Sequence, residues 1–176
     1  MFGLNFHTQK EQVYLWVRRE CVVRSEKMNI AFNIPTYTID NETFPIPSIG
    51  NYDYWVSLIE TFLAKSNIIE IHCWNDENGV IEEITFLHKQ AFQIVIEENL
   101  TIFKGSRTCN LAQYLLNNFM SENGNFKWFT VNLIKDNESV FHSGHWATEF
   151  FIPNLLEEEV RFIKSVIPVD TSLFQF

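Results

Sequence analysis

Residues 68–87 constrain the fold of this chain most, because two β-rich runs flank the dipeptide Asn78-Gly79. Asn-Gly is the pair that most readily adopts the positive φ angles of a two-residue hairpin turn. With this turn, Ile71 lies opposite Phe86 on one apolar face of the hairpin. A hairpin with one apolar and one polar face is typical of an antiparallel sheet with a single buried side. The sequence therefore predicts that these residues form an antiparallel hairpin.

The polar face of this hairpin carries four candidate binding residues, Glu70, His72, Trp74 and Glu83. Trp is enriched at the energetic centres of protein interfaces, so Trp74 is interpreted as an anchor for a partner. In the alternative interpretation, a helix or loop covers Trp74 and His72 makes only local hydrogen bonds. The sequence leaves both interpretations open.

Apolar periodicity predicts the remaining elements and the fold class. Helices are expected over residues 53–66, from Thr108 or Asn110 to 120, and from a capping box of Asn154 and Glu157 to 167. Strands are expected over residues 13–23, 30–34, 92–97, 100–104, 126–135 and 140–152, and an irregular loop over 35–50. This pattern predicts a single α+β domain over residues 1–176, a mostly antiparallel sheet of hairpins with two or three helices packed on one face.

The charge distribution indicates the kind of partner. The net charge is −9, although residues 1–27 hold five Lys or Arg against three Glu, so the acidity lies in the rest of the chain. Neutralisation of phosphates requires basic surfaces, so we expect no nucleic-acid binding. Complementary fields favour a protein partner with a basic surface. Seventeen Phe and five Trp add the expectation of an aromatic patch for a ligand or partner.

Cysteine usage and hydropathy indicate the compartment. Three widely spaced cysteines without a CxxC pair are typical of a reducing environment. The first residues lack the pattern of a signal peptide, and no apolar run approaches the ~18 residues of a membrane span. Asn is abundant and Ala is scarce, which is typical of an AT-rich bacterial genome. We therefore expect a cytoplasmic bacterial protein without membrane association.

A second set of candidate residues, His142, His145 and Glu149, lies in one short segment. Two imidazoles and a carboxylate are the donors of many catalytic zinc sites that leave one position open for water. On an extended strand, residues three apart point to opposite faces, so convergence requires a bend at Gly144. The hypothesis from this segment is a metal-dependent hydrolase.

The function expected from these observations is a non-enzymatic protein-binding module without a cofactor. Its concrete form is an acidic immunity- or antitoxin-like inhibitor that covers a basic partner. The metal-dependent hydrolase is one alternative, and a small-ligand binding protein with a Phe- and Trp-lined pocket is another. The sequence contains no GxGxxG or GxxxxGK[ST] loop, so it gives no indication of phosphate binding.

Overall fold

Ten strands and four helices form in the residues that the computed structural model describes, which are 26–39, 44–88 and 90–176. The strands are β1 (Met28–Asn33), β2 (Thr36–Tyr37), β3 (Ile46–Pro47), β4 (Ile68–Trp74), β5 (Phe92–Ile96), β6 (Leu100–Ser106), β7 (Thr130–Lys135), β8 (Glu138–Gly144), β9 (Glu149–Leu155) and β10 (Ser172–Gln175). The helices are α1 (Asp53–Leu63), α2 (Asn78–His88), α3 (Cys109–Asn117) and α4 (Glu157–Val166).

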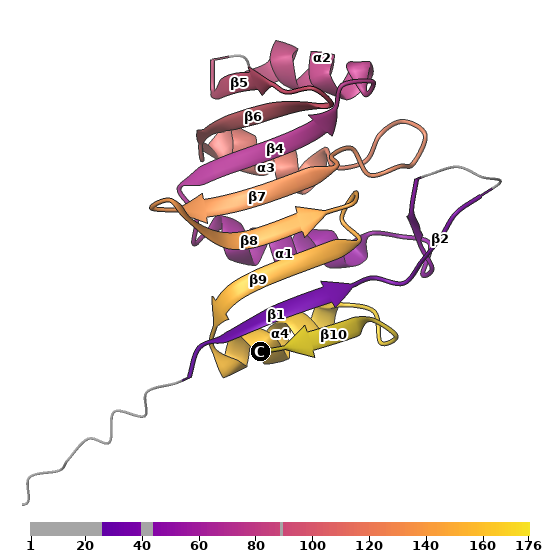
Figure 1. Cartoon of the computed structure of the whole chain (residues 1–176), viewed down its shortest axis with the longest axis vertical. Coiled ribbons are helices and arrows are strands. Elements are labelled where there is room, and N and C mark those ends of the chain that lie inside the picture. Colours follow the sequence, from indigo (N-terminus) through magenta and orange to yellow (C-terminus); the bar gives the residue numbers. More distant parts are fainter. Residues whose placement is uncertain (1–25, 40–43, 89) are drawn as a thin grey trace, which may run out of the picture.

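Eight of the strands form one antiparallel sheet in the order β10-β1-β9-β8-β7-β4-β6-β5. Helices α1, α3 and α4 lie behind this sheet in Figure 1, and α2 lies at its β5 end. The predicted α+β class with a mostly antiparallel sheet is confirmed. The predicted strand over residues 13–23 lies outside the described residues, and the loop expected over 35–50 contains the short β2–β3 pair.

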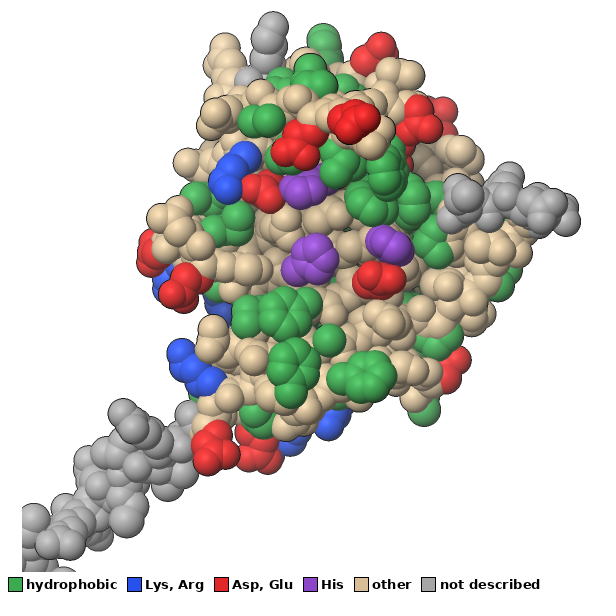
Figure 2. Space-filling view, in the orientation of Figure 1, with side chains coloured by type: hydrophobic (Ala, Val, Ile, Leu, Met, Phe, Trp, Pro, Cys, Tyr) green, Lys and Arg blue, Asp and Glu red, His purple; other side chains and the backbone are tan. Residues whose placement is uncertain are grey.

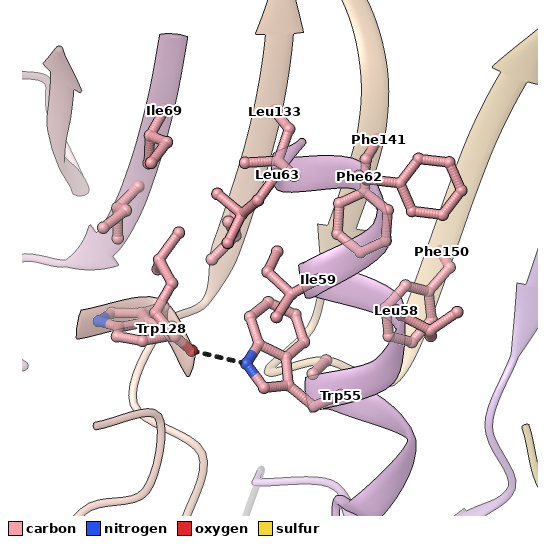
Figure 3. Close-up of a cluster of buried hydrophobic side chains, with 14 of the residues drawn as sticks. Trp55, Leu58, Ile59, Phe62, Leu63, Ile69, Trp128, Leu133, Phe141 and Phe150 are labelled. Carbon is pink, nitrogen blue, oxygen red and sulfur yellow. Dashed lines mark hydrogen bonds between the residues drawn. The ribbon is translucent and has the colours of Figure 1, made fainter. Parts of the chain in front are cut away.

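Helix α1 supplies the centre of the hydrophobic core. Its apolar residues recur at helical spacing, and Figure 3 shows them pointing at the covered face of the sheet. Trp55 is fully buried, and its ring lies 4.7 Å from that of Phe126. The indole Nε1 of Trp55 donates a hydrogen bond of 3.0 Å to the carbonyl of Leu115, drawn as a dashed line in Figure 3. This contact joins α1 to α3 across the core.

The predicted hairpin over residues 68–87 is wrong. Strand β4 pairs with β6 on one side and β7 on the other, so Ile71 lies opposite Phe103 and Val131. Residues 78–88 form α2 instead, with Ile84 fully buried and Phe86 87% exposed. The turn preference of Asn-Gly is local. Pairing both edges of β4 with distant strands satisfies more backbone groups than one local hairpin does.

Gly79 provides a test of this correction. In α2 it has negative φ, and an added Cβ would meet no atom within 4 Å. We expect Gly79→Ala to raise the free energy of unfolding by about 0.5–1 kcal/mol, because alanine loses less backbone entropy in a helix. Urea denaturation measures this difference.

The matched control is Gly124→Ala, where φ is +82° and no atom lies within 4 Å. This control is expected to lower stability, because alanine is strained at positive φ. Destabilisation by Gly79→Ala would contradict the helix and favour the hairpin turn.

The smaller local predictions are mostly confirmed. The β5–β6 hairpin has the expected register, with Val95 opposite Ile102. The Thr108 hydroxyl caps α3 by accepting from the Leu111 amide at 3.2 Å. The cap expected at Asn154 is wrong, because Asn154 belongs to β9. The Glu159 carboxylate instead accepts from the Leu156 amide at the start of α4.

Candidate functional site

The sheet face opposite α1 carries no helix of the described residues, and we call it the bare face (Figure 2). One register row crosses it from edge to edge. The row contains Gln93, Lys104, Glu70, Asn132, His142, Phe151, Ala31 and Phe174, from β5 to β10. Side chains directly opposite in a sheet share a face, so these eight residues form one continuous strip. The strip is polar on the β6 to β8 side and apolar on the β9 to β10 side.

Glu70 is the centre of a hydrogen-bond network in the polar half. Its carboxylate accepts from Lys104 Nζ at 2.9 Å, from His72 Nε2 at 2.9 Å and from Asn132 Nδ2 at 3.0 Å. Burial alone would raise the pKa of Glu70, but the hydrogen bonds from Lys104, His72 and Asn132 outweigh it and lower the pKa to about 2. Glu70 is therefore ionised and held rigidly in place at neutral pH.

The same network fixes His142. Because Asn132 donates its amide hydrogens to Glu70, its carbonyl oxygen accepts from His142 Nδ1 at 2.7 Å. Burial and the nearby His72 lower the pKa of His142, so the ring is neutral at pH 7. In the described part of the chain, neither His72 nor His142 has a hydroxyl or thiol side chain within hydrogen-bond distance. Among the described residues, the hydrogen-bond partners of the two rings are a carboxylate and an amide.

The proposed metal ligands do not form one site. His145 Nδ1 lies 3.3 Å from Glu149 Oε1 in an exposed pair, whereas His142 is bound to Asn132. Within the described ranges, no group of three or more His, Cys, Asp or Glu is placed to hold a metal ion. The expected bend at Gly144 is also displaced, because Gly144 keeps negative φ and the chain turns in the following residues.

That turn, between β8 and β9, has an unusual backbone. His145, Trp146 and Ala147 have consecutive φ angles of 47°, 53° and 60°. Left-handed backbone costs roughly 1–2 kcal/mol for each residue with a Cβ, and it persists only where surrounding contacts impose it. Tyr54 on α1 donates its hydroxyl to the Ala147 carbonyl at 2.8 Å, and the Thr148 hydroxyl bonds the His145 carbonyl at 2.7 Å. The core side of the molecule thus holds this turn in shape.

The turn places Trp146 in an aromatic group at one end of the bare face. The Trp146 ring lies 5.1 Å from Phe129, and Phe129 lies 4.7 Å from Trp74. These half-buried rings line a cavity of about 690 Å³ together with Pro45, Asp76, Glu77 and His145. We call this cavity the aromatic hollow. Its volume lies in the range of small-ligand and side-chain pockets.

Two carboxylates border the aromatic hollow. Glu77 accepts from the Trp146 indole and from the Trp74 backbone amide, each at 2.8 Å. Burial raises the pKa of Glu77, since these two hydrogen bonds do not fully offset the lost hydration. Asp76 is exposed, and its carboxylate makes no hydrogen bond or ion pair with any described residue. Among the described residues, no Lys or Arg lines the hollow, so its lining is acidic in composition.

Glu83 does not share the bare face with Glu70, His72 and Trp74, contrary to the prediction. It lies on α2, where its carboxylate accepts from Lys127 Nζ at 2.7 and 2.9 Å and from the Tyr114 hydroxyl at 3.1 Å. This ion pair lines a second cavity of about 780 Å³, which shares Asp76 and Glu77 with the aromatic hollow. Glu70, His72 and Trp74 lie on one partly buried face of β4, as the sequence predicted.

The far end of the bare face is apolar. Phe174 and Phe176 are 62% and 67% exposed, and the ring of Phe176 stacks on Phe151 at 6.3 Å. In Figure 2, hydrophobic side chains gather both above and below the histidines in the middle of this face. Exposed aromatic clusters of this kind are typical of interaction surfaces.

Sequence reasoning missed Asp76, Glu77, Asn132, Phe129 and Trp146. Trp146 lies inside the segment proposed for metal binding, but its role depends on the left-handed turn. Asp76 and Glu77 were assigned to a hairpin strand, although they precede a helix. The acidic and apolar residues after position 80 alternate with a period that fits a helix as well as a strand. A helix predicted there would have left Asp76 and Glu77 in the loop before it.

Comparisons of the chain with protein-family models, with curated protein sequences and with solved structures gave no significant match. Among the described helices, none has the length and apolar character needed to cross a membrane.

Proposed function

We propose that the protein is a cytoplasmic bacterial binding module that holds a basic protein partner on its bare face. An acidic immunity- or antitoxin-like inhibitor that covers a basic effector is the concrete form of this proposal. The observation that carries it is the composition of the bare face, which exposes aromatic rings at both ends and carries carboxylates between them. A few residues carry most of the binding energy at protein interfaces, and Trp is enriched among them, whereas complementary charge supplies specificity and speed.

Several features of the site support binding over catalysis. The bare-face imidazoles are held by carboxylate and amide partners and not by a hydroxyl or thiol. The one lysine in the central network, Lys104, is already paired with Glu70. The carboxylates of Asp76 and Glu149 are exposed and therefore accessible to a partner. Such a surface attracts a cationic protein and repels an anionic one.

The test is affinity capture from a lysate of the source cells, with the wild-type chain and three variants as baits. We expect Trp74→Ala and Glu149→Lys to retain at least tenfold less of a stoichiometric partner than the wild type. Glu60→Lys is the matched control, because Glu60 is exposed on α1 behind the sheet. High salt should release the partner, since screening weakens interactions between exposed charges.

Glu70 is a poor site for charge reversal, because its loss also breaks the network that it centres. A partner retained equally by all four baits, or no stoichiometric partner at all, would contradict the proposal. Each variant must keep the wild-type unfolding midpoint within a few degrees for the comparison to count.

A further inference from the structure

We infer that the aromatic hollow binds the guanidinium group of an arginine side chain that the partner protein presents. This inference rests on the proposed function and names the chemistry at its centre. It starts from the composition of the hollow, in which the described residues supply three aromatic rings, two carboxylates and one histidine but no lysine or arginine.

The rings supply the first part of the recognition. Trp74, Phe129 and Trp146 form a continuous wall, with neighbouring centroids 4.7 and 5.1 Å apart. A cation over the face of such rings is attracted by their quadrupole, most strongly over Trp. Guanidinium is planar and weakly hydrated, and it stacks on aromatic faces better than ammonium does. The wall therefore favours arginine over lysine.

The carboxylates supply the second part. Glu77 is half-buried at the wall, and its oxygens accept from an indole and a backbone amide but from no basic side chain of the described residues. Asp76 precedes it in the chain, and the Asp76 carboxylate makes no hydrogen bond or ion pair with any described residue. Buried or partly buried charges are normally paired, so the partly buried Glu77 lacks a basic partner among the described residues, and the exposed Asp76 adds a second acceptor at the same place. A guanidinium presents several N–H donors and can bond a carboxylate in bidentate geometry.

The strained turn supplies the third part. Three consecutive left-handed residues hold the Trp146 indole against Glu77 and beside Phe129. The Tyr54 hydroxyl and the Thr148 hydroxyl fix the same turn from the protein interior. Backbone strain of this kind is associated with functional sites, where it preorganises side chains. The hollow thus keeps its shape before a ligand arrives, which lowers the entropic cost of binding.

The test uses the full chain and three probes: the blocked tripeptides Gly-Arg-Gly and Gly-citrulline-Gly, and methylguanidinium chloride. Citrulline replaces the guanidinium by a neutral group of the same shape. We follow the indole N–H resonances of Trp74 and Trp146 by NMR during each titration. The arginine peptide is expected to shift both resonances saturably and to bind at least tenfold more tightly than the citrulline peptide.

Two variants locate the site. Asp76→Asn is expected to weaken binding of the arginine peptide at least threefold, whereas the matched exposed control Asp170→Asn leaves it unchanged. Trp146→Phe, which keeps an aromatic ring but loses the indole N–H bond to Glu77, is expected to weaken it further. Because Asp76 is exposed, its variant tests the site even where Trp146→Phe perturbs the turn.

The outcomes separate this inference from the proposed function. Equal binding of the arginine and citrulline peptides overturns the guanidinium site. Binding of methylguanidinium but not of the arginine peptide also overturns it, because the occupant is then a small molecule. A captured partner that Glu149→Lys loses, without any arginine-peptide binding, overturns the inference and leaves the proposed function standing. Arginine-peptide binding with no captured partner supports the site and contradicts the proposed function.

Discussion

Replacing Trp55 with alanine is expected to lower the free energy of unfolding by about 3–5 kcal/mol, the usual range for truncating a large buried aromatic side chain. Trp55 is fully buried, where its ring packs on Phe126, Trp128 and Phe141. The substitution opens a cavity and also removes the donor to the Leu115 carbonyl in the last turn of α3. Urea denaturation with a constant m-value measures the loss.

Two control variants test whether the loss of stability comes from truncating a buried ring. Trp55→Phe keeps an aromatic ring in the core, so we expect a smaller loss than for alanine. Phe86→Ala removes a ring that is 87% exposed on α2 and is expected to change stability by less than about 0.5 kcal/mol. The hairpin predicted from the sequence would place Phe86 in the core opposite Ile71. A large loss for Phe86→Ala with a small one for Trp55→Ala would therefore contradict the observed fold.

Replacing Glu70 with glutamine is expected to lower the free energy of unfolding at pH 7 by about 2–3 kcal/mol. At about 1.4 kcal/mol per pKa unit the pKa shift of Glu70 corresponds to roughly 3.5 kcal/mol, and screening by solvent at this partly exposed site reduces that value. In the folded chain the pKa of Glu70 is lowered from 4.5 to about 2. A lowered folded-state pKa stabilises the protein above the unfolded-state pKa. This contribution is lost as the pH falls through the folded-state value. The difference between wild type and Glu70→Gln should thus be constant above about pH 5 and shrink toward pH 3.

Denaturation series at pH 7, 4.5 and 3 check this dependence. Glu149→Gln is the matched control on the same face, since Glu149 and its partner His145 are both about half exposed. Exposed pairs contribute little, so we expect less than about 1 kcal/mol at any of these pH values. A wild-type advantage over Glu70→Gln that stays constant down to pH 3 would contradict the network drawn around Glu70.

The two predictions concern opposite faces of the same sheet. Trp55 represents the covered face, where apolar burial holds α1 and α3 in place. Glu70 represents the bare face, where a rigid polar network orients Asn132 and His142. The Tyr54 hydroxyl connects the two, because it reaches from α1 to the strained turn beside the aromatic hollow. The shape of the proposed binding site therefore depends on the core.

Local signals in the sequence determined several elements. The apolar spacing predicted a helix over residues 53–66, which α1 matches up to Leu63, and Thr108 was one of the two caps predicted for α3. Alternation along residues 68–74 placed Glu70, His72 and Trp74 on one partly buried face. These predictions succeeded because helix periodicity, capping and strand alternation depend on residues a few positions apart.

Only the tertiary structure decided which strands meet and what the site contains. The turn preference of Asn78-Gly79 is local. In the fold, β4 pairs with the distant strands β6 and β7, and Asn78-Gly79 begins a helix instead of a hairpin turn. The strip from Lys104 through Glu70 and Asn132 to His142 exists because β6, β4, β7 and β8 are neighbours, an order that no local pattern encodes. The aromatic hollow likewise assembles Trp74, Phe129 and Trp146 from three separate segments. Strand order and register arise from burying one whole face at once, so they are properties of the complete fold.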